Sequence, residues 1–317
     1  MNTKYIIVIL GEPYSTFSEI IGKYFRNRKK LKKKVVLIGS KKLLLDQLKN
    51  LNCLFKLNEI SNVHEAQKNI VNIIDVKFDF KKIYSQETFK SNDYIKSCFK
   101  LSLEILKKNK CILINGPITK KTFLNKKYLG ITEYISKQFK VKNQAMLIYN
   151  KKLSVCPVTT HLPIKSVSSQ ISKNKIIEKS KLINDFYKKN FNKKPKIAVI
   201  GLNPHCESIH NYNEDEKIVK PAVNYLKKKN YLVFGPFSAD TMFLSQNRSK
   251  FDVILGMYHD QVLTPIKTLM EYDAINITLG LPFIRISPDH GPNEKMLGKN
   301  ISNPLSLIRA LEFLDKN

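Results

Sequence analysis

Three of the six histidines, His161, His205 and His259, each come shortly after an apolar segment of strand length. A lone histidine at such a place is most often a half-buried structural side chain. Parallel strands, however, end on one edge of their sheet, so we expect these three imidazoles to lie in one site. Three neutral imidazoles leave a divalent ion its full charge and an open coordination position. The pattern therefore predicts a Lewis-acid metal site and not a closed structural one.

Alternating strand-like and helix-like segments would position these histidines. The expected strands are residues 5–10, 34–38, 111–114, 145–149, 153–158, 196–202 and 231–234, with a further run at 253–255. The expected helices are residues 18–27, 43–48, 92–108, 176–189 and 214–228. This alternation is typical of a doubly wound, mostly parallel sheet, and a hairpin within 145–158 would make the sheet mixed. Residues 51–85 show no clear pattern.

The chain is strongly basic, with 55 Lys and Arg against 26 Asp and Glu and a formal net charge of +29. Such a charge is compatible with a nucleic-acid-binding protein, and a catalytically impaired one is the alternative from another functional class. The lysines are spread over the whole chain, however, and no recognised binding motif accompanies them. We therefore expect a solvated basic surface that attracts phosphate- and carboxylate-bearing small molecules, with no nucleic acid as a partner.

The cysteines and the lengths of the apolar runs bear on the cellular compartment of the protein. The five cysteines are odd in number and show no C-x-x-C pair, which favours free thiols in a reducing compartment. No apolar run approaches membrane-spanning length, and residues 5–10 are too short for a signal peptide. We expect a cytoplasmic protein without a membrane partner.

None of the eleven glycines has G-x-G spacing. The dinucleotide-binding fingerprint and the P-loop are therefore both absent. From the residues alone, this argues against a dehydrogenase of the Rossmann type.

Six short motifs in this chain resemble the signatures of a known family. They are Thr159-Thr160-His161-Leu162-Pro163, Gly201-Leu202-Asn203-Pro204-His205, Ala239-Asp240-Thr241, Tyr258-His259-Asp260-Gln261, Thr278-Leu279-Gly280-Leu281-Pro282 and Asp289-His290-Gly291. The family is that of the 4-hydroxythreonine-4-phosphate dehydrogenases of vitamin B6 synthesis, and the resemblance runs from Gly11 to Gly298. It implies a two-lobed α/β/α fold with a mostly parallel, mixed sheet, similar to isocitrate and isopropylmalate dehydrogenases. We expect lobe A at 1–130 plus 285–317 and lobe B at 131–284.

The resemblance also implies an activity. It is the oxidation of 4-phosphohydroxy-L-threonine by NAD or NADP to a 3-oxo acid, which decarboxylates to 3-amino-2-oxopropyl phosphate on the way to pyridoxal 5′-phosphate. A divalent metal, zinc, magnesium or cobalt, would polarise the substrate hydroxyl and then the ketone. Such dehydrogenases are similar to enzymes that bind NAD through loops of a different fold, so the missing glycine fingerprint does not contradict the resemblance.

Site residues carry over from the family by position. The family's metal ligands, shared across a homodimer interface, match His161, His205 and His259. Its catalytic positions match Asp240 and Lys267. Asp260 and Asp289 could also orient a histidine or relay a proton, although all three aspartates have a plain alternative as turn or cap residues.

The family's substrate-binding positions match Thr132, Lys267, Asn276 and Arg285. A lysine and an arginine suit a phosphate or a carboxylate, the lysine as a point charge and the arginine through bidentate hydrogen bonds. In so basic a chain, either cation alone would be interpreted as a solvated surface residue. Their positions relative to His259 favour a role in binding.

Three segments depart from the family pattern. Residues 14–18 replace a glycine-rich continuation, Ile131 replaces a substrate-contacting histidine, and the segment after Gly291 has Pro292, Asn293 and Lys295 in place of the usual residues. The metal ligands and cationic anchors are intact. Besides the family's own reaction, the chain could therefore act on a different phosphorylated hydroxy acid or have lost catalysis.

Overall fold

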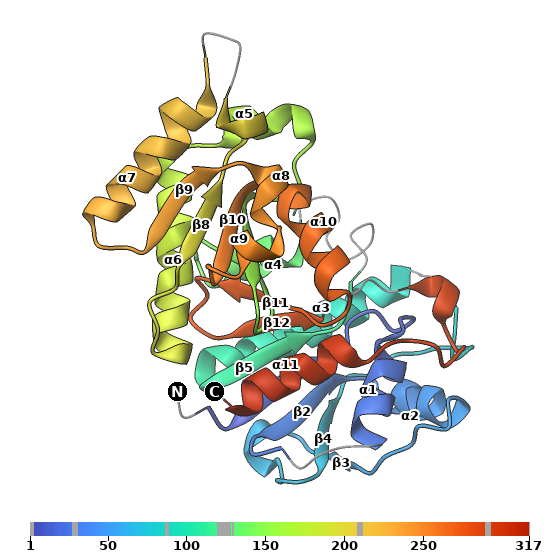
Figure 1. The fold of residues 1–317 in the computed structure, drawn as a ribbon. Helices are drawn as coiled ribbons and strands as arrows, with labels where there is room; N and C mark the ends of the chain where they lie inside the picture. Colours follow the sequence, from blue (N-terminus) through green and yellow to red (C-terminus); the bar gives the residue numbers. More distant parts are fainter. Residues whose placement is uncertain are drawn as a thin grey trace. The chain divides into compact units, whose positions relative to one another are not determined.

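The computed structural model describes residues 3–26, 31–85, 89–118, 128, 130–207, 212–288 and 293–316. The chain forms two compact units, one of Met1–Lys140 with Leu281–Asn317 and one of Val141–Gly280. The two lobes expected from the sequence were divided at 130/131 and 284/285, whereas these units divide at 140/141 and 280/281. Each unit consists of a sheet with helices packed on it (Figure 1), which is the predicted α/β class.

The first unit contains a parallel sheet in the order β3-β4-β2-β1-β5-β12. Its strands are β1 (Tyr5–Ile9), β2 (Lys34–Gly39), β3 (Leu57–Glu59), β4 (Val71–Asp75), β5 (Cys111–Asn115) and β12 (Arg285–Pro288). Strands of a parallel sheet are covered on both faces, which explains their continuous apolar runs. Ile6, Ile7 and Ile9 of β1 are accordingly inaccessible to solvent.

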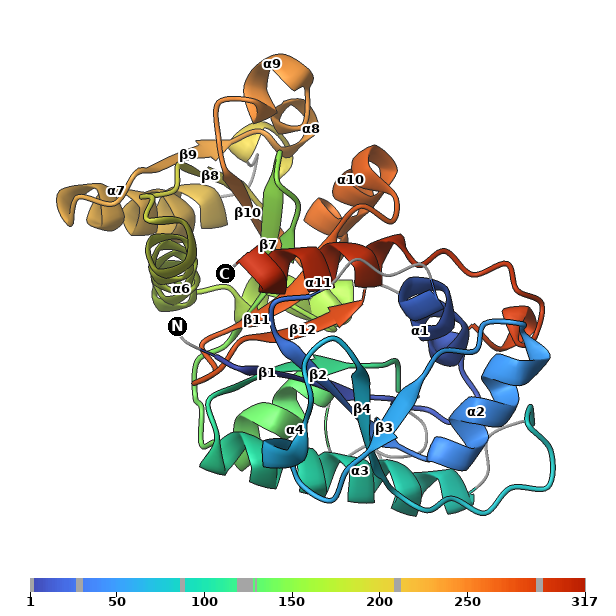
Figure 2. The same cartoon turned by 90° about the horizontal axis from the view of Figure 1, so that it is seen from below.

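Helices cover both faces of this first sheet. They are α1 (Phe17–Arg26), α2 (Lys41–Asn50), α3 (Phe89–Lys108), α4 (Ile131–Gln138) and α11 (Leu305–Lys316). Figure 2 shows α1 and α11 on one side of the sheet and α3 and α4 on the other. The helix expected at 92–108 begins earlier than predicted, at Phe89. The helix expected at 18–27 begins at Phe17, and residue 27 lies outside the described ranges.

The second unit contains a mixed sheet in the order β11-β6-β7-β10-β8-β9. Its strands are β6 (Ala145–Tyr149), β7 (Ser154–Thr159), β8 (Ile197–Ile200), β9 (Val233–Phe237), β10 (Val253–Tyr258) and β11 (Ile275–Leu279). Strand β6 is antiparallel to both β7 and β11, so the predicted hairpin and the mixed sheet are confirmed. Strands β7, β10, β8 and β9 are parallel, and their carboxyl ends share one edge.

The helices of the second unit are α5 (Val167–Gln170), α6 (Lys173–Phe191), α7 (Lys220–Lys228), α8 (Ala239–Met242), α9 (Ser245–Arg248) and α10 (His259–Met270). Figures 1 and 2 both place α6 and α7 on the side of the sheet opposite α10. The helix expected at 214–228 begins instead as a π-helical turn, Asp215–Val219, before α7. No helix within the described ranges is long and apolar enough to cross a membrane.

Candidate active site

Two of the three predicted ligand histidines lie side by side at the carboxyl edge of the second unit's sheet. His161 follows β7 and His259 is the first residue of α10, directly after β10. The pairing of β7 with β10 continues to Thr159 and Tyr258, so the main chain keeps the two strand ends together. The ring centres of His161 and His259 are 5.7 Å apart.

This pair suits a shared metal ion. Two imidazoles that ligate one tetrahedral zinc have ring centres roughly 5 Å apart, close to the observed separation. His259 Nδ1 lies 2.6 Å from Asp260 Oδ1, and the His259 side chain is 34% exposed. A carboxylate on Nδ1 fixes the tautomer of a ligand histidine and leaves Nε2 available for a metal.

The third histidine, His205, stands in a separate turn after β8. It is exposed and adopts a left-handed backbone conformation with φ 55°. Among the described residues, no group of three or more His, Cys, Asp and Glu side chains is arranged to hold a metal ion within one chain. The structure thus brings His161 and His259 together, whereas His205 shares only the sheet edge with them.

A buried carboxylate, Asp215, holds the turn that carries His205. It is inaccessible to solvent and accepts hydrogen bonds from the backbone N–H groups of Leu202 (2.7 Å) and Asn203 (2.9 Å). The strand expected at 196–202 therefore ends at Ile200, because Asp215 takes the donors that would extend it. Nothing in the local sequence pattern distinguished Asp215 from a surface acid.

Asp240 and Cys206 lie near this turn. Asp240 is exposed and lies in the first turn of α8, and its Oδ1 accepts a 2.8 Å hydrogen bond from the N–H of Thr241. Burial raises the pKa of the Cys206 thiol, and the negative charges of Asp215, Glu207 and Asp240 add to the rise. A thiol with a raised pKa is a poor nucleophile, so Cys206 is not a candidate for covalent catalysis.

The other cysteines are also unsuited to chemistry. All five are free, and Cys53, Cys98, Cys111 and Cys156 are buried. Burial raises the pKa of both Cys98 and Cys156 to about 12. These thiols are therefore core residues.

Lys267 and Asn276, predicted to bind substrate, belong to two elements of the second unit. Lys267 is an exposed residue of α10, the helix that His259 begins. Asn276 is half-buried in β11 opposite Ile148, and its Oδ1 is buried without a hydrogen-bond partner in the described part of the chain. A buried acceptor without a donor is uncommon in native proteins, and a bound ligand is one way to satisfy it.

In the first unit, the buried residues Arg285 and Asn115 form a polar cluster with the half-buried Thr132. Arg285 is 1% exposed and donates from Nε to Asn115 Oδ1 (2.8 Å) and from Nη1 to Thr132 Oγ1 (2.9 Å). Burial lowers the pKa of Arg285 to about 10, and the nearby Glu133 opposes the shift, so the guanidinium stays charged at neutral pH. Asn115, which ends β5, was not among the predicted site residues.

Some residues that depart from the family pattern have a packing role in the first unit. Tyr14 and Phe17 are buried core residues, so the segment at 14–18 is packed against the first unit. Ile131 starts α4 and packs, partly buried, against the apolar cluster of that unit. Lys295 is exposed, whereas Asp289, His290, Gly291 and Pro292 lie outside the described residues.

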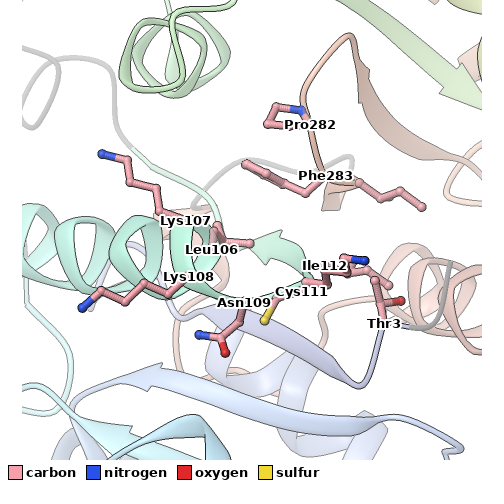
Figure 3. Close-up of a pocket in the computed structure, with 11 residues that line it drawn as sticks. Thr3, Leu106, Lys107, Lys108, Asn109, Cys111, Ile112, Pro282 and Phe283 are labelled. Carbon is pink, nitrogen blue, oxygen red and sulfur yellow. The ribbon is translucent and has the colours of Figure 1, made fainter.

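A hollow of ≈ 430 Å³ in the first unit contains none of the predicted site residues. It lies between the end of α3, the start of β5 and residues 282–284 (Figure 3). Figure 3 shows the side chains of Lys107 and Lys108 directed away from Phe283. Because no predicted site residue lines it, the hollow is not assigned to the reaction.

Comparisons with known families, sequences and solved structures all identify similar proteins of one family. The family model of the pyridoxal phosphate biosynthetic protein PdxA matches residues 30–314. The chain is 40% identical over 317 residues to 4-hydroxythreonine-4-phosphate dehydrogenase of Sulfurihydrogenibium sp., covering 97% of this chain and 96% of that protein. The crystal structure of 4-hydroxythreonine-4-phosphate dehydrogenase from Klebsiella pneumoniae has a TM-score of 0.84 at 27% identity, with coverage of 100% and 99%.

A more distant structure has the same fold. Isocitrate dehydrogenase from Methylococcus capsulatus has a TM-score of 0.52 at 10% identity, covering 99% of this chain and 85% of that one. The predicted fold relationship is thereby confirmed. Together with the full-length similarity to named dehydrogenases, these matches show that the chain belongs to the PdxA family of oxidoreductases.

Proposed function

We propose that this chain oxidises 4-phosphohydroxy-L-threonine with NAD or NADP, giving a 3-oxo acid that decarboxylates to 3-amino-2-oxopropyl phosphate. The observation that carries the proposal is the His161–His259 pair at a strand-end edge, with a 5.7 Å ring separation that suits a shared metal ion. The relatives that share this chain's full length are named for that dehydrogenase activity. A step in pyridoxal 5′-phosphate synthesis follows from the family.

His161, His205 and His259 are proposed to hold a divalent ion, zinc, magnesium or cobalt. When bound, the ion supplies Lewis-acid polarisation, first of the substrate hydroxyl and then of the ketone. Asp260 supports this role by keeping His259 in one tautomer. Ligands shared across a homodimer would explain why no group of three such side chains occurs among the described residues of one chain.

The remaining residues of the second unit would act on the substrate. Asp240 is exposed and would take up the proton from the substrate hydroxyl oxygen, while the carbon that bears this oxygen would give a hydride to the nicotinamide. In the second step the bond to the substrate carboxylate would break, carbon dioxide would leave, and the electron pair would move toward the ketone oxygen; the resulting enolate would then take up a proton at the carbon that lost the carboxylate. Lys267 would contribute a positive charge for the anionic substrate, and Asn276 Oδ1 would accept a hydrogen bond from a substrate donor.

Arg285 and Thr132 would bind an anionic group of the substrate. The guanidinium keeps its charge at neutral pH, and its hydrogen bonds to Asn115 and Thr132 hold the planar fork in one orientation. An oriented arginine loses less side-chain entropy on binding than a flexible one. The nicotinamide cofactor follows from the family, and no residue is assigned to it.

A cytoplasmic homodimer is the proposed state of the protein. Five free cysteines suit a reducing compartment. A dedicated nucleic-acid surface is not proposed, because no recognised binding motif accompanies the lysines, and the described lysine–aromatic pairs are distributed over both units, as Lys34–Tyr5, Lys107–Phe139 and Lys173–Tyr225 illustrate.

One observation favours a second candidate, a dehydrogenase of a different phosphorylated hydroxy acid. Ile131 cannot donate a hydrogen bond, and it packs beside the apolar cluster next to Thr132. A substrate with a less polar group would suit this position better than one that requires a donor.

The test is NADH or NADPH formation with 4-phosphohydroxy-L-threonine and added divalent metals. We expect turnover that is lost on chelation and restored by zinc, magnesium or cobalt. A panel of other phosphorylated hydroxy acids serves as the comparison. Turnover of another acid alone would support the second candidate, and no turnover of any would refute the proposed oxidation.

A further inference from the structure

Gln261 links the two strand ends that carry His205 and His259. Strands β8 and β10 pair from Ile197↔Val253 to Val199↔Leu255, and the ladder stops there. Beyond it, Gln261 Oε1 accepts from the N–H of Met257 (2.7 Å), and Gln261 Nε2 donates to the carbonyl of Gly201 (2.7 Å). A side-chain amide thus occupies the position where the main chains would otherwise approach each other.

The amide acts as a spacer. A direct N–H···O=C bond joins two strands at about 2.9 Å, whereas two hydrogen bonds in series through an amide hold the same groups several ångströms farther apart. The β7 side of β10 differs, because main-chain pairing continues there to Tyr258 and Thr159 Oγ1 donates to the carbonyl of Met257 (2.8 Å). The backbone at Met257 is therefore bonded directly to the strand that precedes His161, whereas the Gln261 amide separates it from the strand that precedes His205.

Glycines make room for this arrangement. A Cβ at Gly256 would lie 3.0 Å from Gln261 Oε1 and 2.4 Å from Val262 Cγ1. A Cβ at Gly201 would lie 2.9 Å from Asp215 Oδ1. Asp215 is the carboxylate that accepts from the backbone of the turn carrying His205. Both strands thus lack a side chain at the points where Gln261 and Asp215 approach them.

We propose that Gln261 is a positioning residue whose amide sets the spacing between the strand ends bearing His205 and His259, and that binding of a divalent metal, to which each subunit of the proposed dimer contributes both histidines, depends on this spacing. The inference rests on the proposed function, since it takes these histidines as ligands. In this role Gln261 is not itself a ligand of the metal. Its effect is transmitted through the backbone of Gly201 and Met257.

The test measures metal binding directly, without turnover. Zinc affinity is determined by competition with a chelating dye, and the ligand geometry is followed by the absorption spectrum of the Co²⁺-loaded protein. Gln261→Met keeps the side-chain length and loses both hydrogen bonds, and we expect a 10- to 100-fold loss of zinc affinity, the usual effect of removing a residue that orients a ligand. Gln261→Glu keeps the acceptor for Met257 but sets a carboxylate oxygen against the carbonyl of Gly201, so it should also lower zinc affinity. It serves as the second variant in case Gln261→Met does not fold.

Thr268→Ala is the matched control, because Thr268 is an exposed residue of the same helix with one hydrogen bond to Thr264 (3.0 Å). It should leave zinc affinity and the Co²⁺ spectrum unchanged. Wild-type affinity and spectrum in both Gln261 variants would overturn the positioning role while the histidine site stands. If instead wild-type protein binds no zinc, or His205→Ala binds it undiminished, the proposed metal site fails and this inference with it.

Discussion

Replacement of Arg285 should impair both the fold and substrate binding, because this cation is buried as well as oriented. Its side chain is 1% exposed and donates to Asn115 and Thr132. A hydrogen bond from a charged donor contributes about 1.5–3 kcal/mol, so two of them contribute several kcal/mol. Part of this is offset in Arg285→Ala, because the desolvation that lowers the pKa of Arg285 to about 10 is relieved when the charge is removed.

The net expectation for Arg285→Ala is a loss of about 2–4 kcal/mol in unfolding free energy. For a domain the size of the first unit, this corresponds to a fall in Tm of roughly 5–10 °C. The Michaelis constant should rise by about ten- to a hundredfold, since a charge-assisted hydrogen bond to the substrate is lost as well. Arg285→Lys keeps the charge but not the planar fork, so it should show a smaller change in both quantities.

Lys267→Ala is the comparison that separates binding from folding. Lys267 is exposed, so its removal should change the unfolding free energy by less than about 0.5 kcal/mol while the Michaelis constant rises about as much as in Arg285→Ala. Calorimetry and steady-state kinetics on the same preparations measure both quantities. An unchanged Tm in Arg285→Ala would refute the buried cluster, and unchanged Michaelis constants in both variants would exclude these residues from the binding site.

Three further changes test the remaining site residues. His205→Ala should abolish stoichiometric metal binding and leave Tm nearly unchanged, because the side chain is exposed; metal analysis that shows full occupancy would exclude it as a ligand. Asp260→Asn should lower zinc affinity about tenfold by releasing the tautomer of His259, and an unaltered affinity would show that this contact is incidental. Ile131→His should raise kcat/KM on 4-phosphohydroxy-L-threonine up to about tenfold if a donor is missing there, whereas a fall from a measurable rate would indicate a pocket adapted to another substrate.

The fold class could be predicted from the sequence because its signals are local. Apolar runs such as those of β1 and β5 are continuous where both faces of a parallel strand are covered, and amphipathic periodicity marks α3 and α6. Strand β4 was missed since Asn72 interrupts its apolar run. This asparagine is fully buried, and its amide donates to the carbonyls of Val35 (3.0 Å) and Gln67 (2.9 Å), a compensation that no local pattern displays.

Part of the candidate site could likewise be predicted from the sequence, and part of it could not. Its histidines were visible in the sequence because each follows a strand, and strand ends of a parallel sheet share an edge. The three-dimensional structure alone decided that His205 stands in a turn apart from the His161–His259 pair, that Arg285 is buried against Asn115 and Thr132, and that Asp215 and Gln261 hold the strand ends. Arg285 lies 170 and 153 positions from its two partners in the chain. Hydropathy patterns specify which face of an element is buried, but which polar atoms meet across such separations is set by how the strands are ordered in the folded sheet.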